Sequence, residues 1–495
     1  MRRASTGFAI TPLGASTLMS VVILLASIAR WGEGYRPRLP LEHSNVAYSL
    51  ASGAGYSNPF GVDSGPTAWV PPGIPIAYAG ALRLAWALHV DERAPIVGIN
   101  TVAAALAVFL MLRFCLAGWE ARSRTAFCAA FLAYAVLDPD FLVSSSPLTA
   151  AGTAFLLAGL ADAARNPGGR AAWAMIFVAN ALLAAIHPGL ALAGLLASLG
   201  AVFFGVGKPA TLARSVGFAA VAGIALGAGP WTLRNRLAFH EWIPAKSNGM
   251  FELVLSQQET DNGVLSESSL LVGHPSTNPR LLAEYARLGE RAFLEPYRRR
   301  AAEILRTDLG RYCVFSLNRL YNALCLSAPP ADIDAVSVRL RPDEAARLVG
   351  RRLVLMCAGT PDFFWARSSE PVAAEMANLR ASGIDDPSEV LADWSRAQQV
   401  IRARAEGRWA RFTRFAWSGL PTLCFLAALA AARRSTPHPV VAAGAIYLVA
   451  LIPNILITHD MRHQLSFMLL FAVLVAGMVE ATCGQREPAR GQAAR

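Results

Sequence analysis

Long apolar runs alternate with short polar connections along most of the chain. Ten of these runs approach or reach the length of about 17 to 25 residues with which a helix crosses a bilayer. They lie at 9–29, 94–116, 124–141, 143–163, 171–187, 189–207, 213–231, 412–432, 437–457 and 464–481. The pattern predicts an all-α polytopic membrane protein with about ten transmembrane helices.

The same pattern divides the chain into six parts. Residues 1–30 hold the first run, which we interpret as a retained signal anchor because no convincing small-residue cleavage site follows it. The other parts are a first polar loop at 31–93, the next six runs at 94–233, a large polar region at 234–411, the last three runs at 412–481 and a tail at 482–495.

Basic residues favour one orientation of this arrangement. With a cytoplasmic amino terminus, the short inner connections and the tail collect Arg113, Arg122, Arg124, Arg165, Arg170, Lys208, Arg214, Arg433, Arg434, Arg486, Arg490 and Arg495. Positive charge is the usual mark of cytoplasmic connections. The outer side then receives the loop 31–93, the region 234–411 and the link ITHDMRHQ at 457–464.

Composition supports the membrane class and disfavours nucleic acid as a partner. The chain is 54% hydrophobic and 16% charged, and its net charge of +11 comes from residues scattered at the ends of apolar runs. Lys and Arg in those places set topology, so we expect membrane lipids as the surroundings and no nucleic acid. The span interiors carry Asn100, Asn180 and Asn454 but no acidic, Lys or His residue near a centre, which disfavours an ion-coupled carrier.

Cysteine and histidine spacing does not predict a metal site. The seven cysteines form no metal-binding pattern, and Cys325 and Cys357 are either a disulfide in an oxidising compartment or two free buried thiols. His459, Asp460 and His463 lie close together, but their spacing suits a solvated link better than a set of metal ligands.

The large polar region contains three predicted helices. Residues 280–306 and 310–325 show helical spacing of apolar positions. The second segment carries Asn318 and Arg319 in its middle, so it is predicted to lie at the interface rather than to form an eleventh span. A third helix is predicted to start at Asp386, with a capping box, and to run to about Gly407.

The first polar loop carries the most informative residues. Glu42 begins a short helical segment that ends at Gly53, and the motifs GYSNPFG and GPTAWVPPG follow it. Their order resembles the first outer loop of bacterial membrane glycosyltransferases of the GT-C superfamily, in the branch of protein O-mannosyltransferases and aminoarabinose transferases. IHPGLAL at 186–192, the segment 229–253, the helix pair around 284–320 and THDMRHQL are also similar to segments of those enzymes.

The resemblance covers most of the chain except 326–411, which looks like an insertion. The wider GT-C superfamily more often carries Asp as the carboxylate of this loop. Members of the branch named above often carry Arg where this chain has Asn45. The resemblance implies a GT-C-like bundle in a bacterial-type inner membrane, with the amino terminus cytoplasmic and the active site on the periplasmic face.

The reaction implied is transfer of a sugar from a polyprenyl-phosphate donor, with inversion, to a lipid, glycan or protein acceptor. That chemistry requires a carboxylate that accepts the acceptor proton and cations that stabilise the leaving phosphate. Relatives with monophosphate donors imply no cofactor and no obligatory metal. Two other functions stay open: a carrier of lipid-linked precursors, and a scaffold that has lost catalysis but binds a lipid-linked glycan or assembles partners.

Specific residues follow from the resemblance. Glu42 is the expected base, although a solvated carboxylate at a helix start is the simpler alternative. Arg462 is expected on the donor phosphate, followed by Arg234 and Lys246, although arginines near span ends also act as anchors. The expected substrate contacts are Asn45, Tyr56, Asn58, Trp69, which can stack on a sugar, and Asn248.

Overall fold

The computed structural model describes residues 11–32, 41–137, 141–166, 169–203, 210–258, 263, 265, 273–325, 423, 426, 438–457 and 467–483. Regular secondary structure in this part of the chain is helical, and an isolated bridge joins Ser57 to Pro66. The all-α prediction is therefore confirmed for these residues. The predicted insertion 326–411, with Cys357 and the helix from Asp386, and the link residue Arg462 lie outside the described residues.

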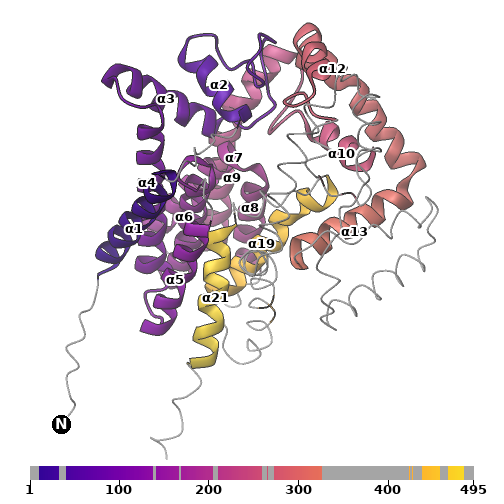
Figure 1. Cartoon of the computed structure of the whole chain (residues 1–495). Coiled ribbons are helices and arrows are strands. Elements are labelled where there is room, and N and C mark those ends of the chain that lie inside the picture. Colours follow the sequence, from indigo (N-terminus) through magenta and orange to yellow (C-terminus); the bar gives the residue numbers. More distant parts are fainter. Residues whose placement is uncertain are drawn as a thin grey trace, which may run out of the picture.

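A bundle of helices makes up most of the described structure (Figure 1). Four stretches are long and apolar enough to cross a membrane: Pro12–Ala29, Arg93–Cys115, Ser146–Arg165 and Ser215–Phe239. Each of the other nine predicted spans coincides with a helix, and only Leu423 and Leu426 of 412–432 are described. The structure therefore supports a helical membrane protein, while the count of ten spans stays a prediction. The helices are α1 (Pro12–Gly32), α4 (Arg93–Leu110) continued by η1 (Met111–Cys115), α5 (Ala121–Leu137), α6 (Ser146–Arg165), α7 (Arg170–Ile186), α8 (Pro188–Phe203), α9 (Ala210–Phe239), α19 (His438–Leu456) and α21 (Met468–Cys483).

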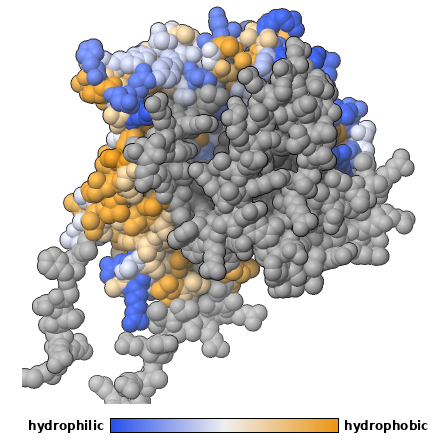
Figure 2. All heavy atoms as spheres, viewed as in Figure 1, coloured by the Kyte–Doolittle hydropathy of each residue, from blue (hydrophilic) through white to orange (hydrophobic). Residues whose placement is uncertain are grey.

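The outer surface of the bundle is apolar. On α1, Leu13, Leu18 and Leu25 are 65%, 56% and 59% exposed, whereas Met19 and Ile23 on its other face are buried. Figure 2 shows apolar residues gathered in a band at the level of α1 and α4, with hydrophilic residues above and below. A contiguous exposed apolar band of this kind is the surface that a bilayer covers.

Connections that the charge pattern places on the inner side meet at one end of the bundle. The Arg165 guanidinium, at the end of α6, donates to the carbonyl of Phe114 in η1. The backbone N–H of Glu120 donates to the Glu480 carboxylate of α21 at 3.2 Å. Helix η1 and the connection that follows it thus contact the end of α6 and α21, and the orientation of the chain in the membrane stays a prediction.

The opposite end carries a helical cap formed by α2 (Leu41–Ala51), α3 (Gly73–Leu88), α10 (Gly249–Gln258) and α12 (Pro279–Thr307), which leads to α13 (Leu309–Cys325) (Figure 1). The predicted helix from Glu42 to Gly53 corresponds to α2, and the predicted helices at 280–306 and 310–325 correspond to α12 and α13. The sequence pattern predicted no helix at α3. Its apolar run is too short for a span, yet α3 buries Ile74, Tyr78 and Leu82 against its neighbours.

Helix α13 is fixed to the bundle by a buried cation. The Arg319 side chain is fully buried and donates to the Ile455 carbonyl (2.6 Å), the Gly263 carbonyl (3.2 Å) and the hydroxyls of Ser256 and Ser316 (3.3 and 3.0 Å). Protein groups replace water around this charge, which is the condition for burying a cation. The interfacial position of α13 in the membrane stays a prediction.

Two glycines allow α7 and α9 to approach closely. A Cβ atom at Gly223 would lie 2.4 Å from the Phe177 carbonyl oxygen, and one at Gly227 would lie 2.2 Å from that of Ala181. Small residues four positions apart are a usual device for close helix packing in membranes. The packing of this helix pair therefore depends on the absence of side chains at these two positions.

Gly227→Ala is expected to destabilise the bundle. The added methyl group must push α9 away from α7, and overpacking of this kind typically costs about 1–3 kcal/mol. The measurement is the thermal unfolding midpoint of the purified protein in detergent micelles. Gly229→Ala is the matched control, because a Cβ there meets nothing within 4 Å and alanine favours helix. Equal midpoints for the two variants would contradict the packing argument.

Candidate functional site

Arg234 of α9 braces the loop between α2 and α3. Its guanidinium donates to the carbonyls of Tyr56 and Thr67 at 2.6 and 2.7 Å. It also lies over the rings of Tyr56 and Trp231, at 5.4 and 5.2 Å from their centroids. These contacts use the cation to hold loop backbone, so the structure favours a positioning role for Arg234, and its predicted contact with a donor phosphate stays a prediction.

Asn58 organises the tip of the same loop. Its backbone lies in the left-handed region with φ of 58°, and its side-chain oxygen accepts the backbone N–H groups of Ser64 and Gly65 at 2.9 and 3.2 Å. Asparagine tolerates this conformation and commonly bonds its own turn. Its role here is to close the loop, and contact with substrate stays a prediction.

Asn45 and Tyr56 also direct their polar groups into the loop. The Asn45 amide donates to the Pro59 carbonyl at 3.0 Å. The Tyr56 hydroxyl lies 3.0 Å from the carbonyls of both Val70 and Pro71. These two predicted substrate contacts therefore help to build the loop that carries the motifs.

Trp69 belongs to an aromatic core. The indole is 2% exposed, and its ring centroid lies 4.9 Å from that of Phe60, 5.2 Å from that of Phe251 and 5.7 Å from those of Tyr285 and His274. Burial of this kind leaves no open face for a sugar in the structure as it stands. The predicted stacking contact would require the cluster to open.

Glu290 of α12 holds the GPTAW motif from the other side, and it was not among the predicted site residues. Its carboxylate is 2% exposed and accepts from the Ala68 backbone N–H (2.8 Å), the hydroxyls of Ser247 (2.7 Å) and Tyr285 (2.9 Å), and the hydroxyl of Thr67. We call this carboxylate and its four donors the Glu290 latch. It joins the first loop, the segment before α10 and α12.

A local break in α12 turns Glu290 inward. The preceding residue, Gly289, has φ of 73° and interrupts the helix, a conformation that glycine adopts without a Cβ penalty. Burial raises the pKa of the Glu290 carboxyl, and its four donors oppose that shift. Burial and the neighbouring Glu290 carboxylate raise the pKa of Tyr285, so this hydroxyl stays protonated and can donate. The signal in the sequence was a glycine within a helical pattern.

Glu42 lies at the start of the helix that leads into the loop. It is in the first turn of α2, where the helix dipole favours a carboxylate, and its side chain is 27% exposed. One carboxylate oxygen lies 4.0 Å from the Nε2 atom of His274, whose side chain is 10% exposed. The predicted base is thus accessible and has a buried imidazole beside it.

The next residue, His43, interacts electrostatically with both Glu42 and Lys246. Burial lowers the pKa of His43, the Glu42 charge raises it, and the Lys246 charge lowers it. The His43 Nδ1 atom is buried and has no hydrogen-bond partner in the described part of the chain. Lys246 donates to both oxygens of Glu252 at 2.8 and 3.0 Å.

Asn248 and Glu252 hold Lys246 in place. The Asn248 amide donates to Glu252 at 2.8 Å, and its buried side-chain oxygen has no partner among the described residues. Lys246 is 34% exposed at its side chain, and an ammonium has three donors, of which Glu252 takes two. The structure therefore brings Glu42, His43, His274 and Lys246 into one neighbourhood that contains a proton acceptor and a cation.

His43 is expected to make the unfolding free energy increase as the pH rises toward about 6.5. Its pKa is lowered in the folded protein, so the unfolded chain binds more protons there, and this contribution is complete above about pH 6.5. His43→Gln should flatten the dependence in thermal unfolding from about pH 5 to 7.5. His240→Gln, at an exposed imidazole, is the control, and equal slopes in all three proteins would exclude this role.

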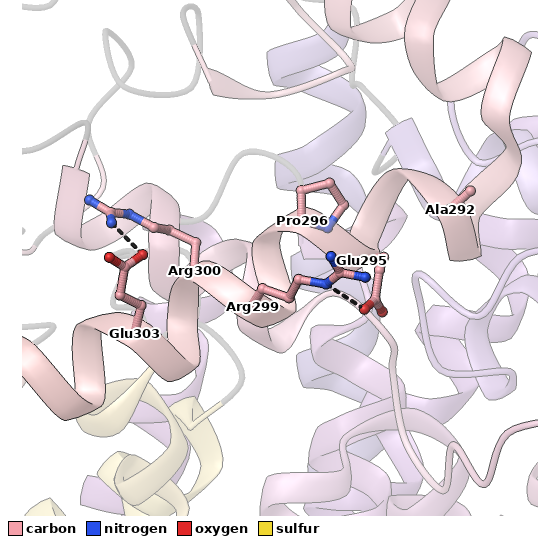
Figure 3. Close-up of a pocket in the computed structure, with 6 residues that line it drawn as sticks. All are labelled: Ala292, Glu295, Pro296, Arg299, Arg300 and Glu303. Carbon is pink, nitrogen blue, oxygen red and sulfur yellow. Dashed lines mark hydrogen bonds and ion pairs between the residues drawn. The ribbon is translucent and has the colours of Figure 1, made fainter.

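A shallow groove lies elsewhere, on the exposed side of α12 (Figure 3). Its charges pair within the helix, Arg299 with Glu295 at 3.0 Å and Arg300 with Glu303 at 2.6 Å. The groove has a volume of about 520 Å³ and is lined by Ala292, Glu295, Pro296, Arg299, Arg300 and Glu303. None of the predicted site residues lines it, so it is not part of the candidate site.

The described residues hold no group of three His, Cys, Asp or Glu side chains arranged for a metal ion. The expectation that no metal is needed stays a prediction. Comparisons of the chain with protein-family models, curated proteins and solved structures found no match. The geometry around Glu42 and the motifs of the first loop are therefore the basis for a functional proposal.

Proposed function

We propose that this chain is an integral membrane glycosyltransferase that moves a sugar from a polyprenyl-phosphate donor to an extracytoplasmic acceptor with inversion. In this proposal about ten spans form a GT-C-like bundle in the inner membrane, with a cytoplasmic amino terminus and a periplasmic cap. The observation that carries it is the position of Glu42. This carboxylate is partly exposed, begins the helix that leads into the motif-bearing loop and lies beside His274, while the next residue, His43, interacts with both Glu42 and Lys246.

Glu42 acts as the general base in the proposed reaction. It accepts the proton of the acceptor hydroxyl as the acceptor oxygen forms a bond to the anomeric carbon. The bond from that carbon to the phosphate oxygen breaks on the opposite face, and polyprenyl phosphate leaves with the electron pair. A carboxylate in the loop that follows the first predicted span suits a donor whose lipid tail stays in the bilayer.

Lys246 and Arg462 are the proposed cations for the leaving phosphate. Arg462 is proposed because of its position in the link 457–464 between the last two predicted spans. The first residue of this link, Ile457, lies next to Gly249 at the start of α10, because a Cβ atom at Gly249 would be 3.7 Å from the Ile457 side chain. The Ser256 hydroxyl also donates to the Ile457 carbonyl at 2.9 Å. The link therefore leaves α19 beside the start of α10, three residues after Lys246.

The experiment that tests the function is transfer of label from a panel of polyprenyl-phosphate sugars. The purified full-length protein in lipid discs is mixed with each donor and with crude cell envelope as the source of acceptor. Enzyme-dependent labelling with one donor is expected, and it would name the sugar. Donor binding without transfer would favour the scaffold function, and absence of both would favour the carrier.

A further inference from the structure

The His274 side chain is held rigidly beside Glu42. The His274 carbonyl accepts the backbone N–H groups of Thr277 and Asn278 at 3.1 and 2.9 Å, which closes a tight turn before α12. The imidazole makes edge contacts with Phe60 at 5.6 Å and with Trp69 and Phe251 at 5.7 Å between centroids. Backbone and ring are therefore both fixed, and the ring cannot turn without disturbing the aromatic core.

Hydrogen bonds at the far side of the ring define its tautomer. The Nδ1 atom lies 3.2 Å from the backbone nitrogen of Ser276 and 2.6 Å from the Ser276 hydroxyl. A backbone N–H can only donate, so Nδ1 is an acceptor and the neutral ring carries its proton on Nε2. Nε2 is the atom that lies 4.0 Å from the Glu42 carboxylate.

We propose that His274 is a positioning residue that orients the Glu42 carboxylate through a neutral Nε2–H donor. This inference rests on the proposed function, because it assigns a partner to the base of that reaction. At 4.0 Å the two groups are beyond hydrogen-bond distance, and catalytic hydrogen bonds often shorten only when substrate is bound.

A neutral donor suits a base better than a cation does. A positive charge beside a carboxylate lowers its pKa and weakens it as a proton acceptor, whereas a neutral N–H fixes its direction at a smaller cost in basicity. Among the described residues, the other ionisable groups recorded near Glu42 are His43, whose pKa burial lowers, and Lys246, which acts on His43 and is paired with Glu252. The arrangement places a neutral donor, rather than a cation, directly beside the Glu42 carboxylate.

Two substitutions separate orientation from packing. His274→Leu fills the aromatic core but removes the donor, and it is expected to lower kcat about 10- to 100-fold with the KM for donor unchanged. His274→Gln places a neutral amide donor near the position of Nε2 and is expected to recover most of kcat. His89→Gln, at an exposed imidazole on the same end of the bundle, is the matched control and should behave as wild type.

The pH profile of kcat/KM gives a readout that packing alone would not move. The His274→Gln variant should keep the acidic limb of wild type, because its donor is also neutral. His274→Lys places a cation beside Glu42 and should shift that limb to lower pH. A wild-type kcat in His274→Leu would overturn the inference. It would also be overturned if His274→Leu and His274→Gln lost kcat equally and the acidic limb of His274→Lys did not move. In either case the proposed function would stand if Glu42→Gln is inactive. If the wild-type protein transfers no label, both the proposed function and this inference fail.

Discussion

Glu42→Gln is expected to lower the rate of sugar transfer by about 10²- to 10⁴-fold, the usual contribution of a general base. Glutamine keeps the size of the side chain but cannot accept the acceptor proton. The fold should persist because Glu42 is partly exposed at the start of α2 and is not buried in a hydrogen-bond network. The measurement compares initial rates of label transfer with donor binding, and binding should be within a few-fold of wild type.

A carboxylate outside the candidate site provides the control for this substitution. Glu295 lies on the exposed side of α12 and pairs with Arg299 at 3.0 Å, so Glu295→Gln removes one carboxylate without touching the cap interior. It should keep the wild-type rate. Unchanged turnover in Glu42→Gln would remove Glu42 from the mechanism, and an equal loss in both variants would point to a general effect of charge.

Glu290→Ala is expected to destabilise the protein by about 3–5 kcal/mol, the range seen when one partner of a buried charged network is removed. The substitution leaves the Ala68 N–H and the hydroxyls of Thr67, Ser247 and Tyr285 buried without their acceptor. Each such donor carries a desolvation penalty. The measurement is the unfolding midpoint in detergent micelles, with protease sensitivity of the 52–72 loop as a local readout.

The matched control for the latch lies on the same helix. Glu303 pairs with Arg300 at 2.6 Å, and both side chains are about half exposed (55% and 47%), so Glu303→Ala should change stability by less than about 1 kcal/mol. Glu290→Gln keeps the shape of the side chain and one acceptor oxygen, so its loss of stability should lie between those of Glu290→Ala and Glu303→Ala. An unfolding midpoint for Glu290→Ala equal to that of Glu303→Ala would show that the latch does not hold the loop.

The helices were largely predictable because apolar periodicity and length determine them. The segment 280–306 was expected as a helix and corresponds to α12, and the segment from Glu42 to Gly53 corresponds to α2. Helix α3 was missed because its 16 residues fall below the length of a span, and length was the criterion that separated spans from loops. Only tertiary packing against α2 and α4 explains why that segment is a buried helix.

The surroundings of Glu42 were less predictable than Glu42 itself. A carboxylate at a helix start next to glycine-rich motifs is visible in the sequence, but His274 lies more than 200 residues away and nothing local marks its orientation. Asn45, Tyr56 and Asn58 were predicted from their place in the motifs, and their polar groups bond the loop to itself. Motif membership could not distinguish residues that build a loop from residues that contact a ligand.

The Glu290 latch also imposes an order on biosynthesis. Thr67 and Glu290 are 223 residues apart, so at about 5 to 20 residues per second the first loop waits roughly 10 to 45 s for its partner. The predicted spans two to seven must enter the membrane during that time. A span inserted in the wrong direction would leave Glu290 on the opposite side of the bilayer, and the loop could not close. Closure of the latch is therefore expected only in chains whose predicted spans two to seven have inserted in the predicted directions.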